Sequence, residues 1–284
     1  MMKMKRCMFA TAPILSVCLL LASGANAAAQ STVSAQSTSA PHSGGGRCSN
    51  RTLSGDYGGQ FAGTILGPDF PVSGVAKAHY DGNGGLTGLE HVIFSGFAPA
   101  VEWVPSSGTY SVNPDCTGRS VTHSTNAPEG LVQFFVLVNQ GQEKRNVVDA
   151  NAFASVELKV SAGLAPGTAR CSNRTLLGEY SAQIVGTILG PNLPLRGLAS
   201  ARYDGKGNFT QVDHIVTGGL APVEEWTPGY GTYSVNPDCT GSAVILSQSS
   251  PDPLNIHFVI VKNGTEIHQV VDANAVTAVA IKVK

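Results

Sequence analysis

The chain has few charged residues and few aromatic ones, and each shortage argues against a class of function. Its 18 Lys and Arg residues nearly balance its 19 Asp and Glu residues, and charged residues make up only 13% of the sequence. Because no basic block occurs, nucleic acid and anionic membrane surfaces are poor partners. Aromatic residues make up 7%, too few for the two aromatic girdles of an outer-membrane pore.

Motifs that carry chemistry are missing as well. The sequence contains no G-x-S-x-G nucleophile elbow, no zinc-ligand spacing and no phosphate-binding loop. We therefore expect no cofactor and no metal, and the catalytic residues stay unknown. The absence of a catalytic motif leaves the enzyme question open while favouring a non-catalytic protein.

The apolar run at residues 8–21 is too short for a stable membrane span. Basic residues precede it, and the small residues Ala25 and Ala27 follow it in a cleavage-site pattern. This order predicts a signal peptide over residues 1–27 and a protein that is exported, secreted or periplasmic, with no transmembrane span in its mature form. Residues 28–46 are rich in Ser, Ala, Gln, Thr and Gly and predict a disordered spacer.

The sequence GTYSVNPDCTG occurs twice, at residues 108–118 and 231–241, an offset of 123 residues. The same offset relates four further segments: RCSNRTL at 47–53 and 170–176, GTILGP at 63–68 and 186–191, YDG at 80–82 and 203–205, and VVDAN at 147–151 and 270–274. These matches indicate that the chain contains two copies of one scaffold: repeat 1 over residues 47–160 and repeat 2 over residues 170–284. Residues 161–169 form the linker.

Each repeat shows short strands at regular spacing with turn signals between them, and no stretch has a helical period. In the first repeat we expect strands near residues 54–66, 72–80, 85–94, 98–104, 108–112, 117–125, 131–139, 143–149 and 153–160. Closure into a barrel removes the exposed edges of such a sheet. The sequence predicts an all-β protein of two tandem homologous antiparallel β-barrels of about eight strands each, with a sandwich as the alternative.

One expected strand, residues 131–138, is apolar on both faces: Leu131, Phe135 and Leu137 lie on one side, and Val132, Phe134, Val136 and Val138 on the other. One face fills the barrel interior. The outer face then needs a cover, and the neighbouring repeat is the obvious candidate. We therefore expect the two repeats to interact.

Four cysteines lie beyond the signal peptide: Cys48, Cys116, Cys171 and Cys239. An even number of cysteines in an exported protein indicates disulfide bonds. Four cysteines allow three pairings, and only Cys48–Cys116 with Cys171–Cys239 uses the same geometry twice. This repeat symmetry predicts one disulfide within each barrel.

The YDG turn followed by GTYSVNPDCTG resembles a group of secreted bacterial tandem-repeat proteins, and the resemblance covers each repeat from Cys48 and Cys171 onward. In turn pattern the repeats are also similar to the barrels of the allene-oxide-cyclase-like and dirigent-like class. That class includes cyclases, proteins that direct radical coupling, and non-catalytic binders. None of its active-site residues aligns with this chain, so the resemblance implies a barrel and no particular site.

Six residues are candidates for lining a ligand site: His91, Glu102, Trp103, His214, Glu225 and Trp226. His91 shares a strand face with Leu89 and Ile93, and His214 shares one with apolar neighbours too, so we expect both histidines inside the barrels. Neighbouring side chains on a strand point to opposite faces, so Glu90–His91 and Asp213–His214 are not catalytic dyads. A histidine held by structural hydrogen bonds, or a tryptophan that plugs one end of the core, is the alternative.

Two other acidic patterns have simpler interpretations. Asp81-Gly82 and Asp204-Gly205 offer too few carboxylates for calcium and predict tight hairpin turns. Asp149 and Asp272 end valine-rich strands, where an Asx cap on the following turn is the favoured interpretation.

Three functions remain open. The first is an exported non-catalytic protein that binds a small, mostly apolar molecule in a barrel. The second is a structural or adhesive envelope protein with sealed barrels, and the third is a barrel isomerase or cyclase. The state of the barrel interiors distinguishes them: an open, apolar interior favours the first, a sealed one the second, and an open one with converging histidine and carboxylate the third.

Overall fold

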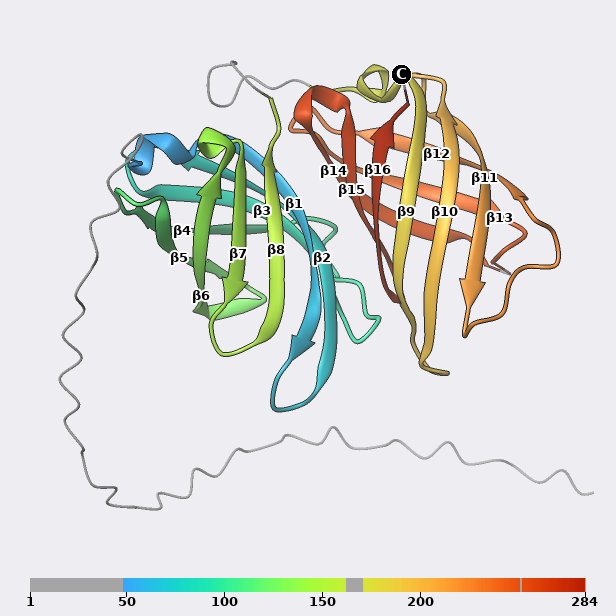
Figure 1. Cartoon of the computed structure of the whole chain (residues 1–284), viewed down its shortest axis with the longest axis horizontal. Helices are drawn as coiled ribbons and strands as arrows, with labels where there is room; N and C mark the ends of the chain where they lie inside the picture. Colours follow the sequence, from blue (N-terminus) through green and yellow to red (C-terminus); the bar gives the residue numbers. More distant parts are fainter. Residues whose placement is uncertain (1–47, 162–170, 251, 284) are drawn as a thin grey trace, which may run out of the picture. The chain divides into compact units, whose positions relative to one another are not determined.

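The computed structural model describes residues 48–161, 171–250 and 252–283, which lie within one compact unit, Gly44–Lys284. The predicted signal peptide 1–27, the spacer 28–46 and all but the first residue of the linker 161–169 lie outside the described residues. Both repeats fold as closed antiparallel barrels of eight strands (Figure 1). The prediction of two tandem all-β barrels is confirmed, and the sandwich alternative is wrong.

The strands of barrel 1 pair in chain order, and β8 pairs with β1 to close the barrel. They are β1 (Ser54–Ile65), β2 (Phe70–Asp81), β3 (Gly85–Phe94), β4 (Val104–Val112), β5 (Thr117–Ser124), β6 (Ala127–Val138), β7 (Glu143–Val148) and β8 (Ala152–Lys159). Two single-turn 3-10 helices, η1 (Asn50–Leu53) and η2 (Asn139–Gly141), lie at the ends of strands. The strand expected at residues 98–104 is absent: the stretch between β3 and β4 is irregular and carries the exposed Phe97 and Val101.

Barrel 2 repeats this order, with β16 pairing with β9. Its strands are β9 (Gly178–Ile188), β10 (Leu193–Tyr203), β11 (Asn208–Thr217), β12 (Thr227–Val235), β13 (Thr240–Ser247), β14 (Leu254–Val261), β15 (Glu266–Val271) and β16 (Ala275–Lys282). The 3-10 helices η3 (Asn173–Leu176) and η4 (Lys262–Gly264) occupy the equivalent places. Among the described residues, no helix has the length and apolar character needed to cross a membrane.

Local chemistry explains the hairpins between β2 and β3 and between β10 and β11. Asp81 Oδ1 accepts hydrogen bonds from the backbone N–H groups of Asn83, Gly84 and Gly85, and Asp204 Oδ1 does the same in barrel 2. Hydrogen bonds from the side chain and backbone of Asn208 lead the contributions that lower the pKa of Asp204 to about 2. Both predicted hairpins are confirmed, and each aspartate closes its own turn.

Disulfides join Cys48 to Cys116 and Cys171 to Cys239, so the predicted pairing is confirmed. In each barrel the bond links the segment before the first 3-10 helix to the Asn-Pro-Asp turn. Behind it, three tyrosines pack edge to face: Tyr57, Tyr80 and Tyr110 in barrel 1 and Tyr180, Tyr203 and Tyr233 in barrel 2. This end of each barrel is therefore closed by the same residues.

Candidate functional site

Barrel 2 encloses a cavity of about 560 Å³, whereas the interior cavity of barrel 1 measures about 130 Å³. Small-molecule sites in proteins usually measure roughly 300–1,000 Å³. Apolar side chains from β9, β10 and β16 form most of the larger cavity, among them Ala182, Ile184, Leu195, Ala199, Val276 and Ala278. By volume and lining, the cavity of barrel 2 is the candidate site.

Side-chain size at equivalent positions explains the difference in volume. Barrel 1 fills its interior with Phe61, Phe94 and Phe153, and the rings of Phe61 and Phe153 lie 5.9 Å apart. The equivalent residues of barrel 2 are Ile184, Thr217 and Val276, all smaller, and all three line its cavity. The same backbone therefore leaves more space in the second barrel.

One end of the cavity of barrel 2 is lined by surface residues. The deep end contains the buried side chains of Tyr180 and Tyr203, next to the disulfide. The other end is lined by the exposed residues Ser249, Asp252 and Ala273, which lie in the hairpins after β13 and β15. A small molecule can therefore enter between these hairpins.

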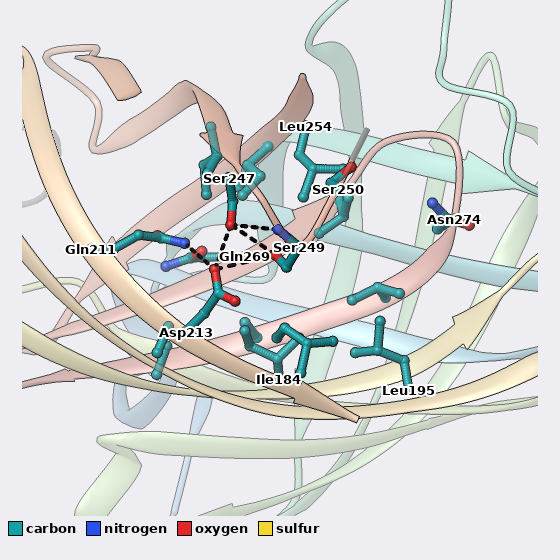
Figure 2. A pocket seen from close by; sticks show the side chains of 18 of the residues that line it. Ile184, Leu195, Gln211, Asp213, Ser247, Ser249, Ser250, Leu254, Gln269 and Asn274 are labelled. Carbon is teal, nitrogen blue, oxygen red and sulfur yellow. Dashed lines mark hydrogen bonds between the residues drawn. The ribbon is translucent and has the colours of Figure 1, made fainter. Parts of the chain in front are cut away.

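A polar cluster lies on one wall of this mostly apolar cavity (Figure 2). Asp213 Oδ2 accepts hydrogen bonds from Gln211 Nε2 at 3.1 Å, Ser247 Oγ at 2.9 Å and Ser249 Oγ at 3.3 Å. Asp213 is only 2% exposed, and its second oxygen, Oδ1, accepts no hydrogen bond from any described residue. A buried acceptor without a donor is costly, so a small rotation of the Asp213 side chain that brings Oδ1 to a hydrogen-bond donor on a ligand would remove that cost.

Barrel 1 carries the same cluster in a filled interior. Glu90, equivalent to Asp213, accepts hydrogen bonds from Ser124 Oγ at 2.7 Å and Asn126 Nδ2 at 2.9 Å. Deeper inside, fully buried Lys144 donates to Glu157 at 2.8 Å. Burial lowers the pKa of Lys144, and the attraction of Glu157 opposes that effect. In place of this pair, barrel 2 has Ile267 and Ala280.

The expectation that His91 and His214 face the barrel interiors is wrong. Their neighbours Glu90 and Asp213 line the cavities instead, and alternation along a strand sends the histidines outward. The apolar neighbours of His91 were misleading because that outer face is itself buried, by barrel 2. None of the six candidate residues lines either interior cavity, so their contact with a ligand stays a prediction: His91, Glu102, Trp103, His214, Glu225 and Trp226.

His91 instead takes part in a polar cluster between the two barrels. Its Nδ1 donates to the carbonyl oxygen of Glu102 at 2.6 Å, and its Nε2 faces Asp272 Oδ1 at 3.0 Å. His257 stacks on His91 with ring centroids 3.5 Å apart and contacts the same Asp272 oxygen through Nδ1 at 3.1 Å. Burial alone would raise the pKa of Asp272, but hydrogen bonds from His257 and His91 outweigh it and lower the pKa to about 2.

This cluster has the residue types of a metal site, but its geometry suits hydrogen bonds better. The ligand atoms of His91, His257 and Asp272 lie within 4.8 Å of one another. The two imidazole planes, however, are only 16° from parallel and stacked. An ion bound by both rings would lie between the planes, whereas a nitrogen lone pair points within the plane of its ring. In this geometry the cluster joins the two barrels through hydrogen bonds.

Glu102 and Trp103 also belong to this junction. Trp103 packs against Val75, Ile93 and Val270, and Glu102 Oε1 lies 3.3 Å from His257 Nε2. In barrel 2, His214 Nδ1 donates to the carbonyl oxygen of Glu225 at 2.6 Å, as His91 does to Glu102, and Trp226 is 45% exposed. The six candidate residues therefore form two equivalent groups, one at the junction, where His91 is buried, and one at the surface.

Sequence reasoning noticed Asp213 only as the neighbour of His214, and it missed Gln211, Ser247 and Ser249. The signal that could have found them is alternation: Gln211 and Asp213 share one face of β11, so they point into the same space. The hydrogen bond between Ser247 and Asp213 depends on how the strands of the barrel are aligned, which no local sequence pattern specifies. No protein-family model matches the chain, and a search of curated proteins found no match.

Proposed function

We propose that this protein is exported and that its second barrel binds a small, mostly apolar molecule without transforming it. The observation that carries the proposal is the 560 Å³ cavity, lined mostly by apolar side chains and open near the hairpins after β13 and β15, with the polar cluster around Asp213 on one wall. The two disulfides are compatible with export, because such bonds persist in oxidising compartments. Because the interior of barrel 1 is filled by side chains, barrel 1 serves to support barrel 2 structurally.

The polar cluster defines the chemistry of the ligand. Asp213 Oδ1 is an acceptor, so the complementary group is a donor such as a hydroxyl or an ammonium at one end of an apolar body. A carboxylate at that position would meet like charge. The described lining of the cavity contains no histidine that could act with Asp213, which favours binding over an isomerase or cyclase reaction. The size and opening of the cavity argue against the sealed scaffold.

A fluorescent apolar probe tests this proposal. N-phenyl-1-naphthylamine should bind the mature protein and brighten, and decylamine or decanol should displace it more readily than decanoate. The variant I184F/V276F gives barrel 2 the two phenylalanines that fill barrel 1. It should fold with unchanged or higher thermal stability and lose most of the probe binding, because it fills the cavity with side chains that the same scaffold already accepts.

The matched control is the reverse exchange, F61I/F153V, in barrel 1. It should leave binding in barrel 2 unchanged, even if it opens a second, weaker site. D213N should bind the probe itself about as well as the wild type and lose the preference for decylamine over decanoate. Probe binding that persists in folded I184F/V276F would refute the proposed site.

A further inference from the structure

The two barrels contact each other through non-equivalent faces. Face A of barrel 1 is the outer side of β8, β1, β2 and β3, represented by Gln60, Val75, His91 and Leu158. Face B of barrel 2 is the outer side of β14 and β15 with part of β16, represented by His257, Val259, Val270 and Asp272. Val75, Val259 and Val270 are completely buried between them. Because the barrels are homologous, barrel 1 also has a face B and barrel 2 also has a face A.

The two remaining faces each carry exposed apolar residues. On face A of barrel 2, Leu198 is 54% exposed and Ile281 is 56% exposed. On face B of barrel 1, Phe134, Val136 and Val147 are 47%, 45% and 56% exposed. The prediction that the neighbouring repeat covers Phe134 and Val136 is thus wrong, although it holds for their equivalents His257 and Val259. The chain therefore leaves face B of barrel 1 and face A of barrel 2 uncovered.

The free faces also keep the polar groups of the junction. On face A, His214 is held by the carbonyl oxygen of Glu225 and by Trp226 in the arrangement of His91, Glu102 and Trp103. Its Nε2 has no partner among the described residues, whereas Nε2 of His91 faces Asp272. On face B, Asp149 holds the position of Asp272.

Gln60 at the junction likewise has an equivalent on the free face A. In the amide orientation that satisfies its neighbours, Gln60 Nε2 donates to the backbone carbonyls of Ala278 and Gln269 in barrel 2. Gln183 takes the place of Gln60 on the free face A, and it is exposed. Phe134 takes the place of His257 and offers a flat ring that can stack on His214. These residues therefore occupy on the free faces the positions that their equivalents hold at the junction.

We propose that copies of this chain associate head to tail, with face B of barrel 1 in one copy docked on face A of barrel 2 in the next. Asp149 of one copy then faces His214 of the other, as Asp272 faces His91 within a chain. Contacts between non-equivalent faces generate a ring when the rotation closes and a filament when it does not. The partner is thus a second copy of this chain.

The repeats differ at several positions of these faces, and one difference weakens the contact directly. At Gly58, on face A of barrel 1, an added Cβ would collide with Val259 Cγ1. The equivalent residue of barrel 2 is Ser181, whose side chain keeps Val136 of the next copy from approaching as closely. The contact between copies is therefore weaker than the contact within one, and the association is reversible and depends on concentration.

Sedimentation velocity of the mature chain over a wide concentration range tests the proposal. The weight-average mass should rise with concentration, and S181G should strengthen the association about tenfold, because it removes the steric obstacle. V136E should block face B and L198E should block face A; both side chains are exposed, so the folds should be unchanged. Each single variant should stay monomeric.

Mixing the two variants distinguishes this contact from a symmetric one. V136E keeps a working face A and L198E keeps a working face B, so the mixture should form dimers and nothing larger. Circular dichroism and thermal unfolding confirm that each variant is folded. The proposal is overturned if S181G remains monomeric at millimolar concentration, if either single variant associates like the wild type, or if the mixture stays monomeric while the wild type associates.

Discussion

Barrel 1 and barrel 2 share strand order, hairpins, tyrosine cluster and disulfide, and they differ in what fills them. Three phenylalanines and a buried Lys144–Glu157 pair occupy the first interior. Smaller apolar side chains leave a cavity in the second. Positions at the closed end keep the same residues in both copies, whereas interior positions vary in volume. A duplicated scaffold can therefore supply a solid support and a hollow site from one backbone.

The outer surfaces differ in a second way. Face B is buried in barrel 2 and exposed in barrel 1, and face A shows the reverse. The residue types differ with burial: exposed Phe134 and Arg145 in barrel 1 correspond to buried His257 and His268 in barrel 2. Four sets of substitutions test which features have the same effect in both barrels and which differ between them.

The largest effect should come from a feature that the barrels share. Each disulfide closes a loop with a sequence separation of 68 residues, which stabilises a domain by about 4 kcal/mol in the chain-entropy model. C48A/C116A and C171A/C239A should therefore each lower the free energy of unfolding by about that amount. Urea unfolding of the two variants measures it. A loss confined to one barrel would show that the two bonds are not equivalent in energy.

The next effect concerns the interior of barrel 1. K144I introduces the isoleucine of barrel 2 and leaves the partly buried Glu157 without its cation, which should cost about 3 kcal/mol. The double variant K144I/E157A reproduces the pair Ile267 and Ala280 of barrel 2 and should recover most of that loss, since an apolar pair needs no compensating charge. Chemical unfolding of all three proteins measures the coupling. Equal losses in the single and double variants would contradict it.

The all-β architecture and the disulfide pairing could be predicted because their signals are local and occur twice. Asp81 and Asp204 specify their hairpins within a few residues, and the equal spacing of the cysteines selects one pairing. The orientation of His91 could not be predicted, because both sides of β3 are buried and alternation does not say which side is the interior. The cavity depends on the summed volumes of side chains such as Ile184 and Val276, which meet only in the folded barrel.

The third effect concerns the junction. G58S places the residue of barrel 2 on face A of barrel 1, where its Cβ would collide with Val259. Overpacking of this kind costs about 1–3 kcal/mol. With Trp226 replaced by phenylalanine, Trp103 alone reports on the junction by its fluorescence, and its unfolding midpoint should fall. S181G, the matched change on the exposed face, should leave that midpoint unchanged at low protein concentration.

The smallest effect should depend on pH. The pKa of Asp272 is about 2 in the folded protein, below its ordinary value of 3.8, so its ionised form stabilises the folded state. That stabilisation is complete above about pH 4 and disappears as the pH falls toward 2. It amounts to about 2 kcal/mol from the size of the shift. D272N should therefore be less stable than the wild type by up to that amount at neutral pH and equally stable near pH 2.

D149N is the matched control, because Asp149 occupies the same position on barrel 1, where it is exposed and accepts a hydrogen bond from the N–H of Ala150. At micromolar concentration it should change the free energy of unfolding by only a few tenths of a kcal/mol, the usual scale for surface substitutions. Urea unfolding of the three proteins at intervals from pH 2 to 7 gives the two differences directly. A constant difference between D272N and the wild type across that range would mean that His91 and His257 do not stabilise the carboxylate of Asp272.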